Sequence, residues 1–344
     1  MRTYFRIEHY LMLGMVLVAG CATEATQHSA APAQPTAAPA AGVKYPVIPK
    51  GKDSDLTLYY ADGRTARGAA ALGNMQRDAE LILWLAGNQF FAMDDVVRAF
   101  QRRNPGVDVG LITLPPGFLM DAILAGGWMY EGKSYPGLPD VYASVNLGHL
   151  KNLKKAGLMD RYAVYMHNEL EIMVAKGNPK AIRGIKDLVR AGIRTSMPNP
   201  INEGIMQFYA RKVLERHGIW NQVSAGQECY SCQTTPQNWF TLVHHRETPD
   251  RIKAGTSDAG IVWKTETQEA VRSGAPVEAV ALPPEDSLVN EVAYAIGALK
   301  NSPRKAMAEK YLDFLKTPES QSAYAKYGFV NATAAELQLK PIPD

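Results

Sequence analysis

From residue 80 to the C-terminus, short apolar segments of strand length alternate with amphipathic segments of helix length, and this alternation limits the fold more than any other feature. Leu81–Leu85 is continuously apolar, which is typical of a buried strand. Met93–Arg103 has an apolar helical face formed by Val96, Val97 and Phe100. Successive units of this kind give a parallel sheet with helices on both faces. We therefore predict an α/β fold.

The same alternation continues and restarts after Tyr165, which predicts a second sheet. The further predicted strands are 107–114, 140–143, 170–175, 193–197, 260–263 and 294–299, and the further predicted helices are 118–125, 185–190 and 204–217. Ser302-Pro303 and Thr317-Pro318 each place a capping hydroxyl before a proline, which predicts two C-terminal helices. A chain of 344 residues is long enough for two domains, each with its own core.

The N-terminal residues have the pattern of a secreted lipoprotein. Arg2 and Arg6 precede an apolar run over 11–19, and small residues lead to Cys21. The run is shorter than the roughly 20 residues of a spanning helix. We expect residues 1–20 to be a signal peptide and Cys21 to be lipidated, which anchors the protein to a membrane in the cell envelope, on the periplasmic side. A short membrane anchor and a chance apolar start are the alternatives.

The next two segments differ in composition. Residues 21–42 are rich in Ala, Pro, Thr and Gln and have almost no bulky apolar side chains, so they predict a partly extended tether. Residues 43–79 are more mixed, and we expect an N-terminal extension packed on the surface.

The charge balance bears on possible binding partners, and the cysteines bear on a possible disulfide. With 37 Lys and Arg against 34 Asp and Glu, the net charge is +3, which gives no basis for a nucleic-acid partner. Cys229 and Cys232 lie in a stretch, 221–238, that reads as an insertion, and a disulfide that pins this loop is the simplest expectation. A metal site with His244 or His245 and a redox-active dithiol are the alternatives.

Four short motifs follow one another in a fixed order: FxxxNPGVxV at 100–109, PDVYAS at 139–144, MVAKGNP at 173–179 and SDAGIVW at 257–263. In this order they resemble the molybdate-type oxyanion receptors among the type II periplasmic solute-binding proteins of ABC transporters. The resemblance extends from about residue 80 to the C-terminus. It implies two doubly wound α/β lobes, joined by a two-segment hinge, that close on a tetrahedral anion.

The resemblance also implies which turns hold the ligand. In the family, hydroxyls from two turns of the first lobe, backbone N–H groups at helix starts of the second lobe and a tyrosine hydroxyl contact the anion. Here amides, a proline pair and an indole occupy several matching positions, and an anion is still expected because helix N-termini and Arg246 supply donors and charge. The expected ligand-binding residues are Asn88, Gln89, Pro116, Gly117, Asn146, Glu203, Gly204, His244, His245, Arg246 and Trp263.

Two of these assignments have an ordinary structural alternative. Asn88 and Gln89 are also common turn residues. The cluster 244–249 either supplies a histidine to a ligand or metal, or simply leads into a helix capped by Thr248 before Pro249.

Taken together, the residues and the resemblance predict a binding protein rather than an enzyme. No nucleophile elbow, phosphate loop, dinucleotide fingerprint or metalloprotease motif is present in the sequence. We expect lobe 1 to comprise 80–163 and 275–344 and lobe 2 to comprise 164–274, in a monomer that needs no cofactor or metal. It would capture a small anion, such as a molybdate- or tungstate-like oxyanion, for an ABC transporter permease. The alternatives are a metal-binding or redox accessory or sensor protein that uses Cys229, Cys232 and His244 or His245, and a binding protein that serves a sensor kinase.

Overall fold

The computed structural model describes residues 44–242 and 247–344. The predicted signal peptide and tether, with Cys21, and the predicted ligand-binding residues His244, His245 and Arg246 lie outside the described residues. Within the described part, no helix has the length and apolar content needed to cross a bilayer.

The first sheet has nine strands in the order β16-β8-β15-β7-β3-β4-β1-β2, with β17 paired to β8. Its strands are β1 (Leu56–Tyr59), β2 (Thr65–Arg67), β3 (Leu81–Ala86), β4 (Val109–Leu114), β7 (Val141–Ser144), β8 (Arg161–His167), β15 (Ala293–Ala298), β16 (Val330–Asn331) and β17 (Lys340–Pro341). The predicted parallel arrangement holds for β3 with β4 and with β7. However, β15 runs antiparallel to β7 and β8, and β1 runs antiparallel to β4, so the sheet is mixed.

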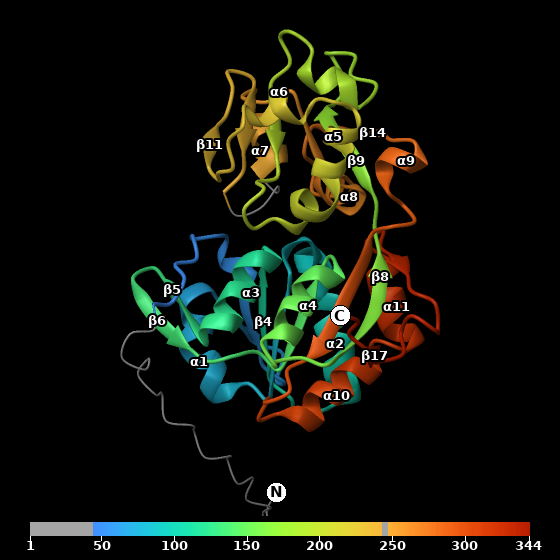
Figure 1. The fold of residues 1–344 in the computed structure, drawn as a ribbon. Coiled ribbons are helices and arrows are strands. Elements are labelled where there is room, and N and C mark those ends of the chain that lie inside the picture. Colours follow the sequence, from blue (N-terminus) through green and yellow to red (C-terminus); the bar gives the residue numbers. More distant parts are fainter. Residues whose placement is uncertain (1–43, 243–246) are drawn as a thin grey trace, which may run out of the picture. The chain divides into compact units, whose positions relative to one another are not determined.

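Helices pack against this sheet and form lobe 1 with it (Figure 1). They are η1 (Asp53–Asp55), α1 (Gly68–Asp78), η2 (Gly87–Ala92), α2 (Met93–Arg103), α3 (Pro116–Ala125), α4 (Leu147–Lys155), α10 (Lys305–Phe314) and α11 (Pro318–Ala325); a hairpin of β5 (Gly127–Tyr130) and β6 (Lys133–Pro136) follows α3. α2 has the predicted bounds because Val96, Val97 and Phe100 are fully buried, and acidic and basic residues lie at its first and last turns respectively. Thr317 caps α11 as predicted, whereas α10 begins two residues after Pro303.

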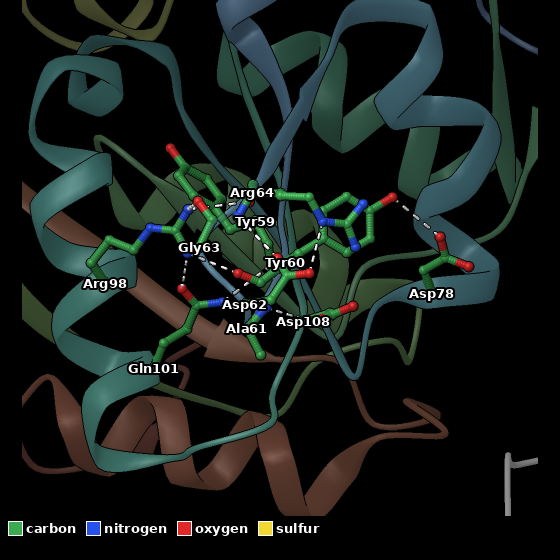
Figure 2. A network of polar contacts seen from close by, with 10 residues as sticks. All are labelled: Tyr59, Tyr60, Ala61, Asp62, Gly63, Arg64, Asp78, Arg98, Gln101 and Asp108. Carbon is green, nitrogen blue, oxygen red and sulfur yellow. Dashed lines mark hydrogen bonds and ion pairs between the residues drawn. The ribbon is translucent and has the colours of Figure 1, made fainter. Parts of the chain in front are cut away.

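Residues 56–78 differ from the expected surface-packed extension, because they belong to the sheet and its core. Leu56–Tyr59 pairs with β4, and α1 covers the strand with buried Leu72 and Met75. Figure 2 shows how the turn after β1 is held: Arg98 of α2 donates to the carbonyl oxygens of Tyr60 and Gly63 at 2.9 and 2.8 Å. The mixed composition of this segment does not indicate a strand, because β1 is stabilised by pairing with β4, about fifty residues away in the chain.

The second sheet has six strands in the order β11-β12-β10-β13-β9-β14 and forms lobe 2 with its helices. Its strands are β9 (Leu170–Ala175), β10 (Thr195–Met197), β11 (Cys232–Gln233), β12 (Asn238–Phe240), β13 (Ala259–Trp263) and β14 (Val277–Ala281). Its helices are η3 (Ile185–Val189), η4 (Met206–Ala210), α5 (Arg211–Arg216), α6 (Trp220–Ser224), α7 (Glu247–Lys253) and α8 (Lys264–Arg272), and α9 (Pro284–Ser287) follows β14. η4 is a π-helical turn inside a continuous helical run, 204–216.

The chain passes between the sheets at two places that differ from the predicted boundaries. β8 stays in the first sheet through His167, and β9 begins the second sheet at Leu170. β14 pairs with β9 along its whole length, so 277–281 belongs to lobe 2, and the return lies within 282–292. The predicted lobe boundaries differ from these crossing points because strand pairing, not local composition, decides which sheet a strand joins.

Candidate functional site

A small pocket lies where turns of the two lobes meet. Its lining comprises Ala86, Gly87, Asn88, Pro115, Pro116 and Val145 from lobe 1, and Glu203, Gly204, Ile205 and Trp263 from lobe 2. The lobe 1 residues end β3 or directly follow β3, β4 and β7. They therefore lie at the carboxyl ends of strands, where α/β sheets hold ligands.

Asn88 is the polar lobe 1 side chain of this lining. It sits in the helical turn η2, is 2% exposed, and its Nδ2 contacts the hydroxyl of Tyr294 on β15. Its Oδ1 is buried and has no hydrogen-bond partner among the described residues. A buried amide end without a partner is costly, and such groups in native proteins call for an explanation.

Glu203 and Gly204 line the pocket from lobe 2, at the start of the helical run 204–216. Glu203 is 2% exposed, and its Oε1 accepts from the backbone N and the Nδ2 of Asn199, both at 3.0 Å, and from the hydroxyl of Thr241. These donors stabilise the carboxylate in its buried position. The first backbone N–H groups of a helical run point outward without intrahelical acceptors.

Trp263 ends β13 and closes the pocket with its buried ring. The ring lies 5.6 Å from Tyr209 and 6.0 Å from Tyr294, so it is held by aromatic side chains of both lobes. Its edge-on and tilted neighbours leave the indole little freedom to move.

Two glycines allow the lobes to approach at this pocket. A Cβ added at Gly204 would lie 2.5 Å from Cγ2 of Val145, and one added at Gly117 would lie 2.9 Å from the backbone of Asn202. Gly117 N also donates to the carbonyl oxygen of Asn202 at 3.2 Å. Larger residues at either position therefore oppose this arrangement of the lobes.

Further contacts between the lobes come from the π-helical turn. Tyr209 donates from its hydroxyl to the carbonyl oxygen of Val145 at 2.7 Å, and Asn146 Nδ2 donates to the same hydroxyl at 3.1 Å. Phe208 packs its ring against His149 of α4, with centroids 4.9 Å apart. A π turn directs these two successive side chains onto lobe 1, which is consistent with the frequent placement of such turns at functional sites.

The structure brings five of the predicted site residues together. Asn88, Pro116, Glu203, Gly204 and Trp263 line the pocket. Their contact with a ligand stays a prediction.

Three other predicted site residues do not line the pocket, and each has a structural role. Gln89 is fully buried, where its amide contacts Ala86 O and the Tyr324 hydroxyl. Gly117 forms the backbone contact to lobe 2, and Asn146 caps α4 by accepting from Gly148 N at 2.8 Å.

Sequence reasoning missed Tyr294, which contacts Asn88 of the pocket lining, and Asn168, which contacts Tyr294. Asn168 donates from Nδ2 to the Tyr294 hydroxyl at 3.2 Å and to Thr265 Oγ1 at 2.9 Å. Both were missed because Tyr294 belongs to an apolar strand and Asn168 to a short connection, and no local pattern signals their meeting.

The cysteine pair forms a disulfide, Cys229–Cys232, as expected. Tyr230, between the two cysteines, packs edge-on against Phe118 of lobe 1, with ring centroids 6.3 Å apart. Among the described residues, no group of three or more His, Cys, Asp or Glu side chains is arranged to hold a metal ion.

Solved structures of periplasmic binding proteins share the fold of this chain. The Azotobacter vinelandii periplasmic molybdate-binding protein matches with a TM-score of 0.55 at 17% identity, over 74% of this chain and 100% of that chain. The sulfate-binding protein of Mycobacterium tuberculosis matches with a TM-score of 0.56 at 20% identity, over 74% of this chain and 88% of that chain. These likenesses identify the fold as that of the two-lobed type II periplasmic binding proteins.

Sequence relatives extend the comparison. The molybdate-binding protein of Mycobacterium bovis is 23% identical over 272 residues, which cover 78% of this chain and 91% of that protein. A sulfate-binding protein of Synechococcus elongatus is 24% identical over 204 residues, which cover 55% and 57% respectively. Solute-binding proteins of this kind are transport components rather than enzymes. The family model of bacterial extracellular solute-binding proteins matches residues 81–330, and the chain belongs to that family.

Proposed function

We propose that this protein captures a small oxyanion in the pocket between its lobes and presents it to the permease of an ABC transporter. The observation that carries the proposal is the unpartnered amide end of buried Asn88, on a side chain that lines the pocket opposite the helical start at Gly204. Oδ1 is an acceptor in this placement, but the two ends of a carboxamide are told apart only by their partners. With the NH₂ group at the unpartnered end, Asn88 and the helix-terminal N–H groups are donors suited to an anion. The molybdate- and sulfate-binding relatives support the same ligand class.

Glu203 is compatible with an anion because its carboxylate is already engaged. Three donors from Asn199 and Thr241 converge on one of its oxygens within lobe 2. Hydrogen bonds to a carboxylate offset part of its negative charge.

A titration of the purified protein tests the ligand class. Isothermal calorimetry with molybdate, tungstate, sulfate and phosphate should give saturable binding of at least one anion, and a hundredfold excess over its Kd should stabilise the fold by about 2.7 kcal/mol. Asn88→Ala should weaken that binding about tenfold to a hundredfold, because it removes a hydrogen bond to a charged group. The exposed Asn301→Ala is the control and should bind as the wild type does.

Other outcomes would contradict the proposal. If thermal shifts appear only with Zn²⁺ or Cu²⁺ and vanish in Cys229→Ser, the metal-binding alternative is correct. If an anion binds equally well to Asn88→Ala and Asn301→Ala, it binds outside this pocket.

We further propose that Cys21 carries a lipid anchor. The support is the sequence pattern before this cysteine, together with a related protein of Bacillus subtilis described as a substrate-binding lipoprotein, 21% identical over 163 residues. Metabolic labelling with a palmitate analogue should mark the wild-type protein in the membrane fraction, and Cys21→Ala should be unlabelled. Labelling that persists in Cys21→Ala would exclude this cysteine as the anchor.

A further inference from the structure

Four buried polar side chains form a chain of hydrogen bonds from the pocket to the second lobe. They are Asn88 of η2, Tyr294 of β15, Asn168 in the connection between β8 and β9, and Thr265 at the start of α8. Each is at most 3% exposed. In such a buried chain the position of each proton determines what the next group can donate or accept.

The orientation of Asn168 is fixed by its partners. Its Oδ1 accepts from Glu169 N at 3.0 Å, and its Nδ2 faces the hydroxyl oxygens of Thr265 and Tyr294. Asn168 therefore donates to Tyr294, and the hydroxyl oxygen of Tyr294 acts as an acceptor on that side. Burial raises the pKa of Tyr294 well above its usual value, so this hydroxyl keeps its proton.

The remaining proton of Tyr294 determines the state of Asn88. If Asn88 also donates to Tyr294, the Tyr294 proton has no acceptor in the described part of the chain, and Asn88 Oδ1 is buried without a partner. The two ends of a carboxamide have the same shape, so hydrogen-bond partners decide which end is which. Turning the amide by 180° gives both the Tyr294 proton and Asn88 Oδ1 a partner, because Tyr294 then donates to Oδ1, and it leaves the NH₂ group as the end without a partner.

We propose that Tyr294, itself oriented by Asn168, is a positioning residue that holds the Asn88 amide with its NH₂ group towards the pocket. This inference rests on the proposed anion-binding function and extends it to residues that do not line the pocket. The NH₂ group then has an N–H donor without an acceptor among the described residues, and a bound ligand would supply that acceptor. It follows that the pocket is organised for a hydrogen-bond acceptor before any ligand arrives.

A pair of tyrosine variants tests the role of the hydroxyl. Tyr294→Phe removes the proton that holds Asn88, and the Kd for molybdate or sulfate should rise about threefold to tenfold, the range of one net hydrogen bond. Tyr311→Phe is the matched control, because it removes another fully buried hydroxyl of lobe 1, on α10. The control should keep wild-type affinity.

Side-chain amide NMR signals provide a second readout that a merely structural role would not move. The Asn88 NH₂ signals, assigned with Asn88→Ala, should shift when molybdate or sulfate is added to the wild type. In Tyr294→Phe they should shift less. Equal Kd values for Tyr294→Phe and Tyr311→Phe, or Asn88 signals that do not move while the anion binds, would overturn the proposal.

Neutron diffraction of the ligand-free, deuterium-exchanged protein separates this inference from the proposed function. The expected density places deuterium on the Tyr294 oxygen, directed at Asn88 Oδ1, whether or not any anion binds. Deuterium on the Asn88 atom that faces Tyr294 would contradict the inference even if calorimetry supports oxyanion binding. Absence of binding to every anion would instead contradict the proposed function alone.

Discussion

At the scale of single residues, two buried ionisable groups, one in each lobe, have pKa values shifted in opposite directions. His149 bonds Ser144 Oγ through Nδ1 at 2.9 Å, and burial lowers its pKa to about 4. Glu171 on β9 is 5% exposed, and burial raises its pKa to about 7, against the lowering effects of Thr267 and Lys264. Both groups are therefore neutral over part of the range in which their ordinary forms are charged.

These displacements predict opposite effects on the pH dependence of stability. Between about pH 6.5 and 4, His149 binds a proton in the unfolded chain but stays neutral in the folded chain. This residue therefore lowers the free energy of unfolding as the pH falls. Between about pH 4.5 and 7 the folded chain keeps a proton at Glu171 that the unfolded chain loses, so this residue makes stability fall as pH rises.

Glu171→Gln removes one of these two effects. Relative to the wild type, its free energy of unfolding should improve by about 3 kcal/mol between pH 4.5 and pH 8, because the amide never has to ionise. Urea denaturation across this range measures the difference. His149→Gln should show the reverse trend, gaining relative stability towards pH 4. Parallel curves for the two variants and the wild type would show that neither group is displaced as described.

At the scale of elements, the fold joins regular α/β units to a few departures from regularity at the lobe contact. The π-helical turn in 204–216 and the glycines at the starts of two helical segments are such departures. Neither Gly117 nor Gly204 has a positive φ, so an alanine is compatible with the local backbone of each. The requirement for glycine comes from the other lobe.

Gly117→Ala should therefore impair ligand binding without impairing folding. The added Cβ meets backbone atoms of Asn202, which cannot move aside, and overpacking of this kind costs about 1–3 kcal/mol, or roughly tenfold in affinity. Gly204→Ala should have a smaller effect, because its Cβ meets the end of the Val145 side chain. Calorimetry with the best-bound oxyanion measures both.

Gly73→Ala provides the control for these variants. Gly73 lies in α1 with no atom within 4 Å of the added Cβ, so the substitution should raise stability by roughly 0.5–1 kcal/mol and leave affinity unchanged. If all three alanine variants bind alike, the approach of the lobes at these glycines is not part of binding.

At the scale of the whole molecule, two connections join lobes that each contribute to one pocket. The chain crosses near Asn168 and again within 282–292. A ligand that contacts both lobes favours the conformation in which those contacts coexist.

Small-angle scattering should accordingly give a smaller radius of gyration when saturating oxyanion is added. Gly117→Ala should show a weaker decrease at equal occupancy, because its added Cβ opposes the approach of the lobes. A radius that stays constant while calorimetry reports binding would exclude closure by hinge motion.

Much of the fold and part of the candidate site could be predicted from local pattern. The bounds of α2 and β9 agree with their apolar periodicity, and Thr317 begins α11 through its own side chain. The family resemblance pointed to Asn88, Glu203 and Trp263, and they line the pocket because the turns after strands lie at one edge of a sheet.

The sequence by itself determined the features that depend on interactions between residues close in the chain: the periodicity of helices and strands, helix capping, and the turns that follow strands. Only the tertiary structure decided that 56–78 joins the first sheet, that β14 joins the second, and that Gln89 turns into the core while Asn88 faces the pocket. It also decided that Tyr294 meets Asn88, 206 positions away. Strand pairing and buried hydrogen bonds join residues distant in the chain, and no local pattern encodes which partners will meet.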